Sequence, residues 1–313
     1  MAFRIVIGDV TIGIQGQDFA YIFSVGMGGM ESLYKDGKEW LYRAPRPAFW
    51  GAVPETDRGN SFVFRSAVWS AADRFVRCVK VAARMDEQEI SMPPAPENNK
   101  YNGDETCDRF EISYTYETPT VPVTEVTVSY LVESDGRIHV QVDYLGKQGL
   151  PELPVLGLRF LMPTAAEGYT YEGLSGETYP DRMAGGIHGV YEVQGLPVTP
   201  YMVPQDCGMH MQTKWLEIVR KTSLDNTDRG GRSSRLKITA EEGKHFAFSC
   251  LPYTAQELEN AMHHEELPPA RRTVVSILGA VRGVGGINSW GADVEDAYHI
   301  SGEQDITYGF WIE

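Results

Sequence analysis

Large side chains alternate with polar ones along most of this chain, which is the pattern of strands that bury one face. Over residues 110–116, for example, Phe110, Ile112, Tyr114 and Tyr116 are each separated by a polar residue. A period of two places such a set on one face of a sheet and the polar residues on the other. We therefore expect β-strands to be the main element of the fold.

Two alternating segments that flank a short polar turn predict a β-hairpin. Apolar residues alternate over 126–132 and again over 138–144, with Asp135-Gly136 between them. Glycine adopts a positive φ at little cost, so an Asp-Gly pair is suited to a tight reversal of the chain. Asp36-Gly37 predicts a second turn of the same kind.

Helical signals are rare by comparison. Thr254 and Glu257 have the spacing of a capping box ahead of Leu258, and Pro268 and Pro269 follow, so this helix should be short. The stretch 92–106 is rich in Pro, Asn and charge, and we expect an exposed loop there. Frequent strands joined by Gly- and Pro-rich turns, without βαβ alternation, predict an all-β antiparallel sandwich.

Length and charge narrow the picture further. Large all-β sandwiches reach 313 residues, so we predict one domain over residues 1–313, with two smaller packed sandwiches as the alternative. The formal net charge is −15, which repels phosphate backbones and anionic membrane surfaces and excludes nucleic acid and membranes as partners. A neutral sugar feels no such repulsion, because hydrogen bonds and ring stacking hold it.

The expected location is the cytoplasm. The first eight residues contain no apolar stretch of signal-peptide length, and no segment approaches the roughly 20 apolar residues of a membrane helix. Four cysteines lie far apart without a CxxC spacing, so we expect reduced thiols rather than a zinc or redox motif: Cys78, Cys107, Cys207 and Cys250.

A glycine-rich segment near the end of the chain is the first candidate for chemistry. Residues 283–291 read GVGGINSWG and end on Trp290, as in a loop that presents a flat side chain. An indole offers an apolar face to the C–H side of a pyranose and one N–H donor at its edge. The alternative is that Trp290 covers the core beneath a glycine-rich turn.

Two further clusters are polar loops with two interpretations each. The first cluster contains Glu177, Tyr179, Asp181 and Arg182, which suit hydrogen bonds to sugar hydroxyls, but the favoured interpretation is structural, with Arg182 holding nearby carboxylates or carbonyls. In the second cluster, the sequence predicts Phe49 and Trp50 in the core. It leaves open whether Asp57 and Arg58, in the loop beyond, contact a sugar.

Other site types are not indicated. His263 and His264 lack the His-Glu-x-x-His spacing that directs two imidazoles at one zinc ion, so a solvated face is the favoured interpretation. Walker, GxGxxG and GxSxG motifs are absent from the sequence. We predict no metal site and no cofactor in this chain.

Five motifs in order along nearly the whole chain carry a family resemblance. They are RPAFW with TDRGN at 46–50 and 56–60, GLSGETYPDRMAG at 173–185, LPVTPYMVPQDCGMHMQT at 196–213, LPYTAQELENAMHHEELP at 251–268 and GAVRGVGGINSWGADV at 279–294. With them the chain resembles the small subunit of heterodimeric β-galactosidases and the C-terminal domain of single-chain β-galactosidases of glycoside hydrolase family 2. Two positions depart from the family: Gly51 replaces its usual arginine, which puts the packing of that loop in question, and Thr178 replaces a common asparagine.

The resemblance implies a large supersandwich of the galactose-mutarotase-like type. It also implies a large catalytic subunit, whose barrel holds the acid/base and nucleophile glutamates and any metal ions, so this chain alone would be inactive. The pair of chains would hydrolyse terminal β-D-galactosides such as lactose. The family's final glycine-rich loop stacks its tryptophan on the sugar, which implies that Trp290, with Asn288 and Ser289, binds substrate.

Two rival functions stay open at this stage. A free-standing aldose epimerase would need a general acid and a general base on one sugar, for which His188, His210 and Glu177 are the candidates. A non-catalytic carbohydrate-binding module would bind sugar without any partner chain.

Overall fold

Antiparallel sheets make up most of the molecule, as the computed structural model shows for residues 2–94, 100–226, 231–288 and 290–313. The first sheet has the strand order β5-β4-β3-β2-β1-β9. Its strands are β1 (Phe3–Ile7), β2 (Thr11–Gln15), β3 (Phe19–Ser24), β4 (Gly29–Lys35), β5 (Lys38–Glu39) and β9 (Thr106–Cys107). The Asp36-Gly37 turn joins β4 to β5 with positive φ at both residues, as predicted.

The second sheet is the largest and has the order β15-β14-β17-β18-β21-β12-β11-β10-β7-β8. Its strands are β7 (Arg77–Met85), β8 (Gln88–Ile90), β10 (Arg109–Glu117), β11 (Glu125–Glu133), β12 (Ile138–Tyr144), β14 (Gly168–Leu174), β15 (His188–Gln194), β17 (Trp215–Arg220), β18 (Ser234–Ala240) and β21 (Ile306–Ile312). The predicted hairpin is confirmed, because β11 pairs with β12 from Val126↔Tyr144 to Val132↔Ile138 and Gly136 has φ 83°.

The third sheet has the order β16-β19-β20-β13-β6. Its strands are β6 (Arg43–Ala48), β13 (Val155–Met162), β16 (Met209–Thr213), β19 (Phe246–Leu251) and β20 (Thr273–Val281). Residues of β13, β19 and β20 are buried along most of their length, which fits strands that are covered on both faces. The all-β prediction is confirmed.

One buried cluster joins the three sheets. Phe23 of β3 packs against Phe110 of β10 with ring centroids 5.7 Å apart, and Phe160 of β13 packs against Phe310 of β21 at 6.2 Å. These four rings belong to a single set of buried residues in contact with one another. We therefore propose that residues 1–313 form one domain.

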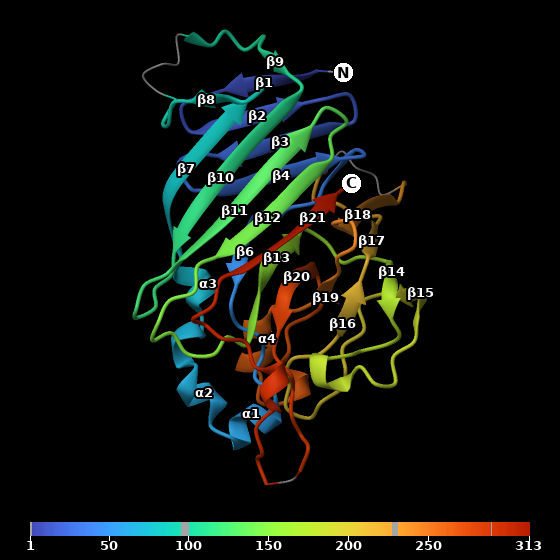
Figure 1. Ribbon diagram of the computed structural model, residues 1–313. Helices are drawn as coiled ribbons and strands as arrows, with labels where there is room; N and C mark the ends of the chain where they lie inside the picture. Colours follow the sequence, from blue (N-terminus) through green and yellow to red (C-terminus); the bar gives the residue numbers. More distant parts are fainter. Residues whose placement is uncertain (1, 95–99, 227–230, 289) are drawn as a thin grey trace.

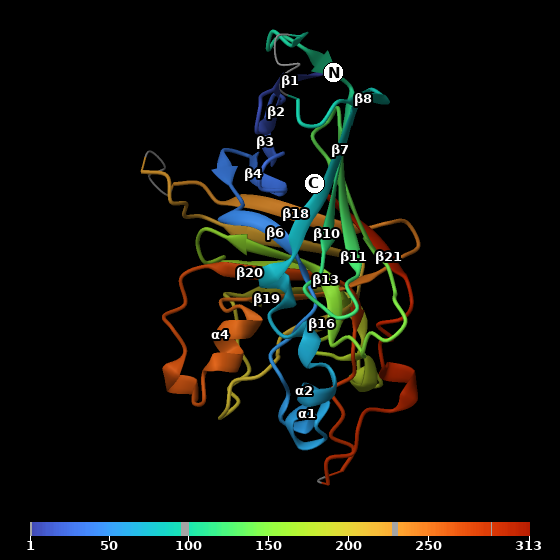
Figure 2. The ribbon, with the colours of Figure 1, turned by 90° about the vertical axis from the view of Figure 1, so that its left-hand side faces the viewer.

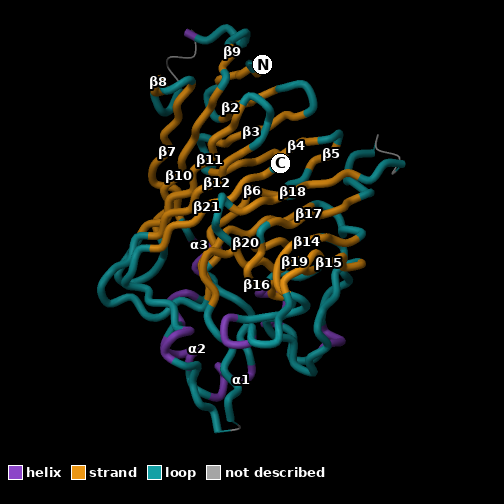
Figure 3. The backbone as a smooth tube through the Cα atoms, turned by 45° about the vertical axis from the view of Figure 1, so that its right-hand side comes forward, coloured by secondary structure: helices purple, strands orange, loops and turns teal. Residues whose placement is uncertain are grey.

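Helices and long loops gather at one end of the molecule, as Figures 1 and 3 show. The short helices are α1 (Glu55–Gly59), α2 (Phe62–Arg65), α3 (Ala72–Phe75) and α4 (Ala255–Asn260), with 3-10 turns η1 (Ala67–Trp69), η3 (Pro180–Arg182), η4 (His264–Glu266) and η5 (Asp296–Tyr298). The view in Figure 2 also places α1 and α2 at the end far from β1. The loop between β20 and β21 lies at the same end.

The helix prediction was right at one place and incomplete at another. At α4, Thr254 Oγ1 accepts from the Glu257 amide at 3.2 Å and Glu257 Oε2 accepts from the Thr254 amide at 2.8 Å, so the capping box is confirmed. The helices α1, α2 and α3 were not predicted. Each has four or five residues, too few for a helical period, and neither α2 nor α3 has a side-chain N-cap bond.

Candidate functional site

Trp290 stands in solvent at the tip of the loop between β20 and β21. Its exposed fraction is 92%, so the interpretation in which the indole covers the core is wrong. Asn288 Oδ1 accepts from the Trp290 amide at 2.8 Å and from the Ala292 amide at 3.3 Å, which closes the tip into a turn. Ser289 lies outside the described residues.

Glycine brings this tip close to α1. Gly291 has φ 76°, and a Cβ built on it would lie 3.1 Å from the carbonyl oxygen of Gly59, the last residue of α1. A side chain at this position would be strained by the backbone conformation and crowded by α1. The loop and the helix are therefore fitted to each other at this contact.

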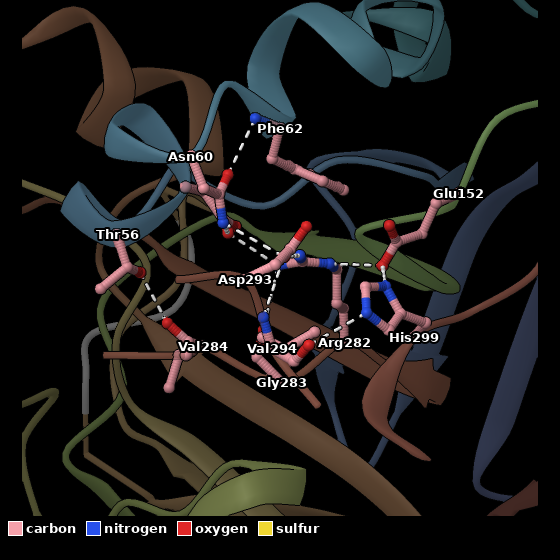
Figure 4. A network of polar contacts seen from close by, with 12 residues as sticks. Thr56, Asn60, Phe62, Glu152, Arg282, Gly283, Val284, Asp293, Val294 and His299 are labelled. Carbon is pink, nitrogen blue, oxygen red and sulfur yellow. Dashed lines mark hydrogen bonds and ion pairs between the residues drawn. The ribbon is translucent and has the colours of Figure 1, made fainter. Parts of the chain in front are cut away.

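Arg282 holds the base of the loop. Only 2% of its side chain is exposed, and the guanidinium donates from Nη1 to Asp57 at 2.7 Å and from Nε to Glu152 at 2.5 Å. Nη2 donates to Asp293, which closes the far end of the loop (Figure 4). A buried cation of this kind is tolerated only because carboxylates surround it.

The carboxylates around Arg282 have further hydrogen-bond and ion-pair partners. Glu152 accepts from His299 Nδ1 at 2.6 Å, and Asp293 accepts from Asn60 Nδ2 at 3.1 Å and pairs with Arg65. Burial raises the pKa of Asp57, and the neighbouring Arg282 offsets only part of that shift. We call Arg282, Asp57, Glu152, Asp293 and His299 the loop anchor.

A second set of bonds fixes the first half of the loop. The Asp181 carboxylate accepts from the amides of Val284 at 3.0 Å and Gly285 at 2.8 Å, and Arg182 donates to the Gly285 carbonyl. Thr56 Oγ1 of α1 donates to the Val284 carbonyl at 2.6 Å. These contacts agree with the structural role favoured for this cluster, because Arg182 holds a nearby carbonyl and Asp181 holds two amides of the loop.

A cleft of about 430 Å³ opens beside this half of the loop. Its lining includes Glu177, Tyr179, Arg182, Tyr201 and Asp206. This volume falls in the range of small-molecule sites, and the lining mixes aromatic faces with a few polar groups. The cleft therefore has the size and the chemistry to hold part of a polar ligand.

Asp206 is the unusual group in this cleft. Burial raises its pKa to about 7, Glu177 adds to the shift, and the Tyr179 hydroxyl, 3.2 Å from Oδ2, opposes it. A carboxyl of this kind is partly protonated at neutral pH, so it can either donate or accept a hydrogen bond. Gly51 lies beside it, because a Cβ built there would be 3.4 Å from the carboxyl group.

The other residues that the sequence analysis singled out differ in how exposed they are. Phe49 and Trp50 are buried, which confirms their place in the core, whereas Asp57 belongs to the loop anchor and Arg58 is exposed. Thr178 is buried, and its Oγ1 accepts from the Met211 amide at 3.1 Å.

The histidines proposed for epimerase chemistry are not among the residues that line the cleft. His188 bonds with Gln212 at 2.7 Å on the surface. His210 is buried against the Tyr169 hydroxyl at 3.0 Å, and burial lowers its pKa to about 4.

Sequence reasoning missed most of the loop anchor. Arg282 and Asp293 lie within the family motif at 279–294, and Asp206 within the motif at 196–213, but no role was predicted for them; Glu152 and His299 lie outside the five motifs. The one available signal was Arg282 itself, a charged residue directly after the apolar run of β20.

The described residues also bear on metal binding and membrane spanning. In the part of the chain that the structure describes, no group of three or more His, Cys, Asp or Glu residues is arranged to hold a metal ion. Over the same residues, no helix has the length and apolar character needed to cross a membrane.

Comparison with known proteins gives one consistent family. The family model described as beta galactosidase small chain matches residues 15–312. The beta-galactosidase small subunit of Latilactobacillus sakei is 56% identical over 308 residues, which cover 98% of this chain and 96% of that protein. A beta-galactosidase of Streptococcus thermophilus is 31% identical over 312 residues, or 99% of this chain, but the match spans only 27% of that longer protein.

Solved structures with a similar course of the chain are distant in sequence. A galactose mutarotase-like protein from Lactobacillus casei ATCC 334 matches with a TM-score of 0.42 at 9% identity, over 97% of this chain and 99% of that one. A galactose 1-epimerase from Lactobacillus acidophilus NCFM matches with a TM-score of 0.40 at 7% identity, over 97% and 93%. The mutarotase-like type of supersandwich stays a prediction.

Proposed function

The chain belongs to the β-galactosidase small chain family, and on that basis we propose that it is the small subunit of a two-chain β-galactosidase. Its region forms 27% of the longer relative from Streptococcus thermophilus, so the remaining functions of such an enzyme would lie on a separate large chain. The proposed reaction is the hydrolysis of terminal β-D-galactosides such as lactose.

The hydrolytic carboxylates are proposed to lie on the large chain. Retaining glycosidases use two carboxyl groups roughly 5 Å apart, one of which must be free to attack the sugar. At the loop anchor, Asp57, Glu152 and Asp293 all accept from Arg282, and Asp181 accepts two backbone amides. These carboxylates position the loop, and we assign any metal ion of the enzyme to the large chain.

The observation that carries the proposal is the exposure of Trp290 on an anchored loop. An indole that is 92% exposed leaves most of its apolar surface in water, which costs free energy in the isolated chain. On a fixed loop tip that surface can stack on a sugar held by a second polypeptide. Asn288 uses only Oδ1 to close the turn, so its amide Nδ2 can donate to a sugar hydroxyl; Ser289 is proposed as a neighbouring contact.

The polar residues around the cleft have different proposed roles. Glu177, Tyr179 and Arg182 line the cleft and are proposed to contact the part of the substrate that extends beyond the galactose. Asp181 and Asp57 are proposed as positioning residues, because their carboxylates hold the loop. Arg58 on α1 is exposed and is proposed as a peripheral contact.

The proposed location is the cytoplasm. The four cysteines are free thiols in the structure, as expected in a reducing compartment. The net charge of −15 supports the proposal that nucleic acids and anionic membranes are not partners.

Co-expression with a matching large chain tests the proposal. We expect hydrolysis of a nitrophenyl galactoside only when both chains are present, because each holds part of the site. The large chain alone and the small chain alone are the controls. Activity that is unchanged when the small chain is omitted would refute the proposal.

Trp290→Ala tests the sugar platform in the assembled enzyme. Loss of an aromatic anchor should weaken substrate binding by about 1–3 kcal/mol, seen as a raised KM or a lowered kcat/KM. Leu224→Ala is a matched control, since Leu224 is 64% exposed and lies in the β17–β18 connection at another part of the surface. Wild-type kinetics for Trp290→Ala would remove the platform role.

The two rival functions make separate predictions for the isolated chain. An aldose epimerase would speed the mutarotation of fresh α-galactose in a polarimeter, and a carbohydrate-binding module would show sugar affinity without a partner. Of its three candidate residues only Glu177 lines the cleft, so the acid and base that the epimerase needs are not brought together there. We expect both measurements to be negative.

A further inference from the structure

A concentration of arginines lies away from the Trp290 loop, around two adjoining clefts. One cleft, of about 460 Å³, is bounded by β6, the residues around α3, and α4. The other, of about 340 Å³, shares Arg43, Asp73, Arg74 and Arg159 with the first. Arg46 and Arg272 complete the set, and we call the two clefts together the arginine groove.

The carboxylates of the groove already have partners. Asp73 pairs with Arg159 at 3.2 Å, and Glu259 accepts from Trp50 Nε1 at 2.7 Å. Glu257 is used by the capping box of α4. The three carboxylates face five guanidinium groups, those of Arg43, Arg46, Arg74, Arg159 and Arg272, so the groove keeps an excess of positive charge.

Four arginines of the groove are left without a carboxylate among the described residues. Arg46 and Arg272 lie over the rings of Tyr116 and Tyr42, with the guanidinium carbon 5.6 Å and 5.2 Å from the ring centroids. Arg43 and Arg74 are exposed, and neither has an ion pair with any acid in the part of the chain that the structure describes. In a chain with a net charge of −15, such a cluster marks a place for an anionic partner.

An exposed aromatic side chain accompanies the arginines. Phe75, the last residue of α3 and the neighbour of Arg74, is 70% exposed. Arginine and aromatic residues are the types enriched where proteins dock on each other, because they combine apolar area with hydrogen-bond donors. The surface around the groove has this composition.

The shape favours a stretch of polypeptide over a small ion. A phosphate or carboxylate ion would occupy one point, whereas the two clefts share four residues and together offer more space than a small ion fills. Guanidinium groups bind side-chain carboxylates in a bidentate manner, so several of them along a hollow can fix the register of an acidic segment.

We propose that the arginine groove receives an acidic segment of the large subunit, with Phe75 packing beside it. The proposal rests on the proposed function, because it needs the second chain. Residues 55–75 connect the groove to the loop anchor, since Asp57 and Asn60 belong to the same run of short helices. A partner docked on the groove would thereby be held in a fixed relation to Trp290.

Charge reversal in the groove tests the proposal. The double variant Arg43→Glu/Arg74→Glu should weaken association with the wild-type large chain at least about tenfold and flatten the salt dependence of the dissociation constant, measured by sedimentation or surface binding. Both side chains are exposed, so the fold should be kept. Lys80→Glu/Lys221→Glu is the matched control, because it changes the net charge equally at exposed positions outside the groove.

A milder double variant shows whether weaker association comes from the lost charges or from misfolding. Arg43→Gln/Arg74→Gln removes the same charges without adding carboxylates, and it should weaken association by a smaller factor. The circular dichroism spectrum and Tm of every variant are compared with those of the wild type. Association that is equally tight for both groove variants and the lysine control would overturn the proposal.

Two other outcomes distinguish a failure of the proposed function from a groove that binds only small anions. If the wild-type chains do not associate at all, the proposed function itself fails, whatever the variants do. If inorganic phosphate binds the isolated wild-type chain, the groove variants lose that binding and assembly is unchanged, then the groove is a small-anion site and the proposal is overturned.

Discussion

Arg282 and Trp290 belong to the same loop, yet their surroundings are the reverse of what their side chains favour. The charged guanidinium is buried with 2% of its side chain exposed, and the large apolar indole is 92% exposed. Folding alone usually places such residues the other way round. The difference indicates that the loop is built to present its tip rather than to stabilise the isolated chain.

The two ends of the loop also differ in what holds them. At the base, three carboxylates surround one guanidinium, and removing the guanidinium leaves the buried Asp57 without its cation. At the tip, among the described residues, the Asn288 side chain closes the turn and Gly291 lies close to Gly59, while the indole itself stays 92% exposed. A loop that is fixed at Arg282 and exposes Trp290 at its tip is suited to a contact with a second chain.

The largest expected effect in the chain comes from removing the base. Arg282→Met should lower the free energy of unfolding by about 3–5 kcal/mol, because Asp57 and Glu152 would lose the cation that compensates their burial. Urea unfolding followed by circular dichroism measures the change.

Arg65→Met is the matched control for this prediction. Arg65 pairs with the same Asp293, but 47% of its side chain is exposed, so its loss should cost less than about 1 kcal/mol. Equal losses for the two variants would show that burial of the guanidinium does not set the strength of the anchor.

The sequence predicted the tip better than the base for a physical reason. A run of glycines ending on Trp290 is a local pattern, and local patterns also revealed the β11–β12 hairpin and the capping box of α4. The anchor, in contrast, joins Arg282 to Asp57 across 225 positions and to Glu152 across 130. Polar contacts over such separations leave no period or spacing in the sequence.

The short helices show a second limit. α1, α2 and α3 contain four or five residues each and are held by tertiary contacts, such as the Trp69 indole of η1 stacked on Phe49 with centroids 5.4 Å apart. Helices of this length are not stable by themselves, so propensity and capping signals are weak. The sequence nevertheless placed Phe49 and Trp50 in the core correctly.

Two carboxyl groups with raised pKa values allow a sharper comparison, because only one of them accepts a hydrogen bond from a guanidinium. Asp57 accepts from Arg282, whereas Asp206 has the Tyr179 hydroxyl as its hydrogen-bonded side-chain partner. The folded-state pKa of Asp206, about 7, lies above its ordinary value of 3.8. The folded protein therefore retains a proton that the unfolded chain loses, and stability falls as the pH rises from about 4 to about 7.

Asp206→Asn should remove this pH dependence. The variant should match the wild type near pH 4 and be more stable by about 1–3 kcal/mol at pH 8, measured by urea unfolding across that range. Asp57→Asn is the contrasting variant and should be destabilising, because Arg282 loses a charged partner. A stabilising Asp57→Asn, or an Asp206→Asn variant that keeps the wild-type slope, would contradict the distinction.

The smallest expected effect is at the tip. Trp290→Ala should change the free energy of unfolding of the isolated chain by less than about 0.5 kcal/mol, because substitutions at exposed positions without packing partners are nearly neutral. Trp69→Ala, at a fully buried tryptophan, should cost about 3–5 kcal/mol in the same urea experiment.

Stability and activity of Trp290→Ala together decide what the tip contacts. A stable variant with weakened galactoside binding and normal assembly places the indole against sugar. A stable variant that no longer joins the large chain places it against protein instead, because the lost surface would then belong to the subunit interface. A destabilised isolated chain would mean that the indole packs on its own subunit in solution, and the contrast between base and tip would no longer hold.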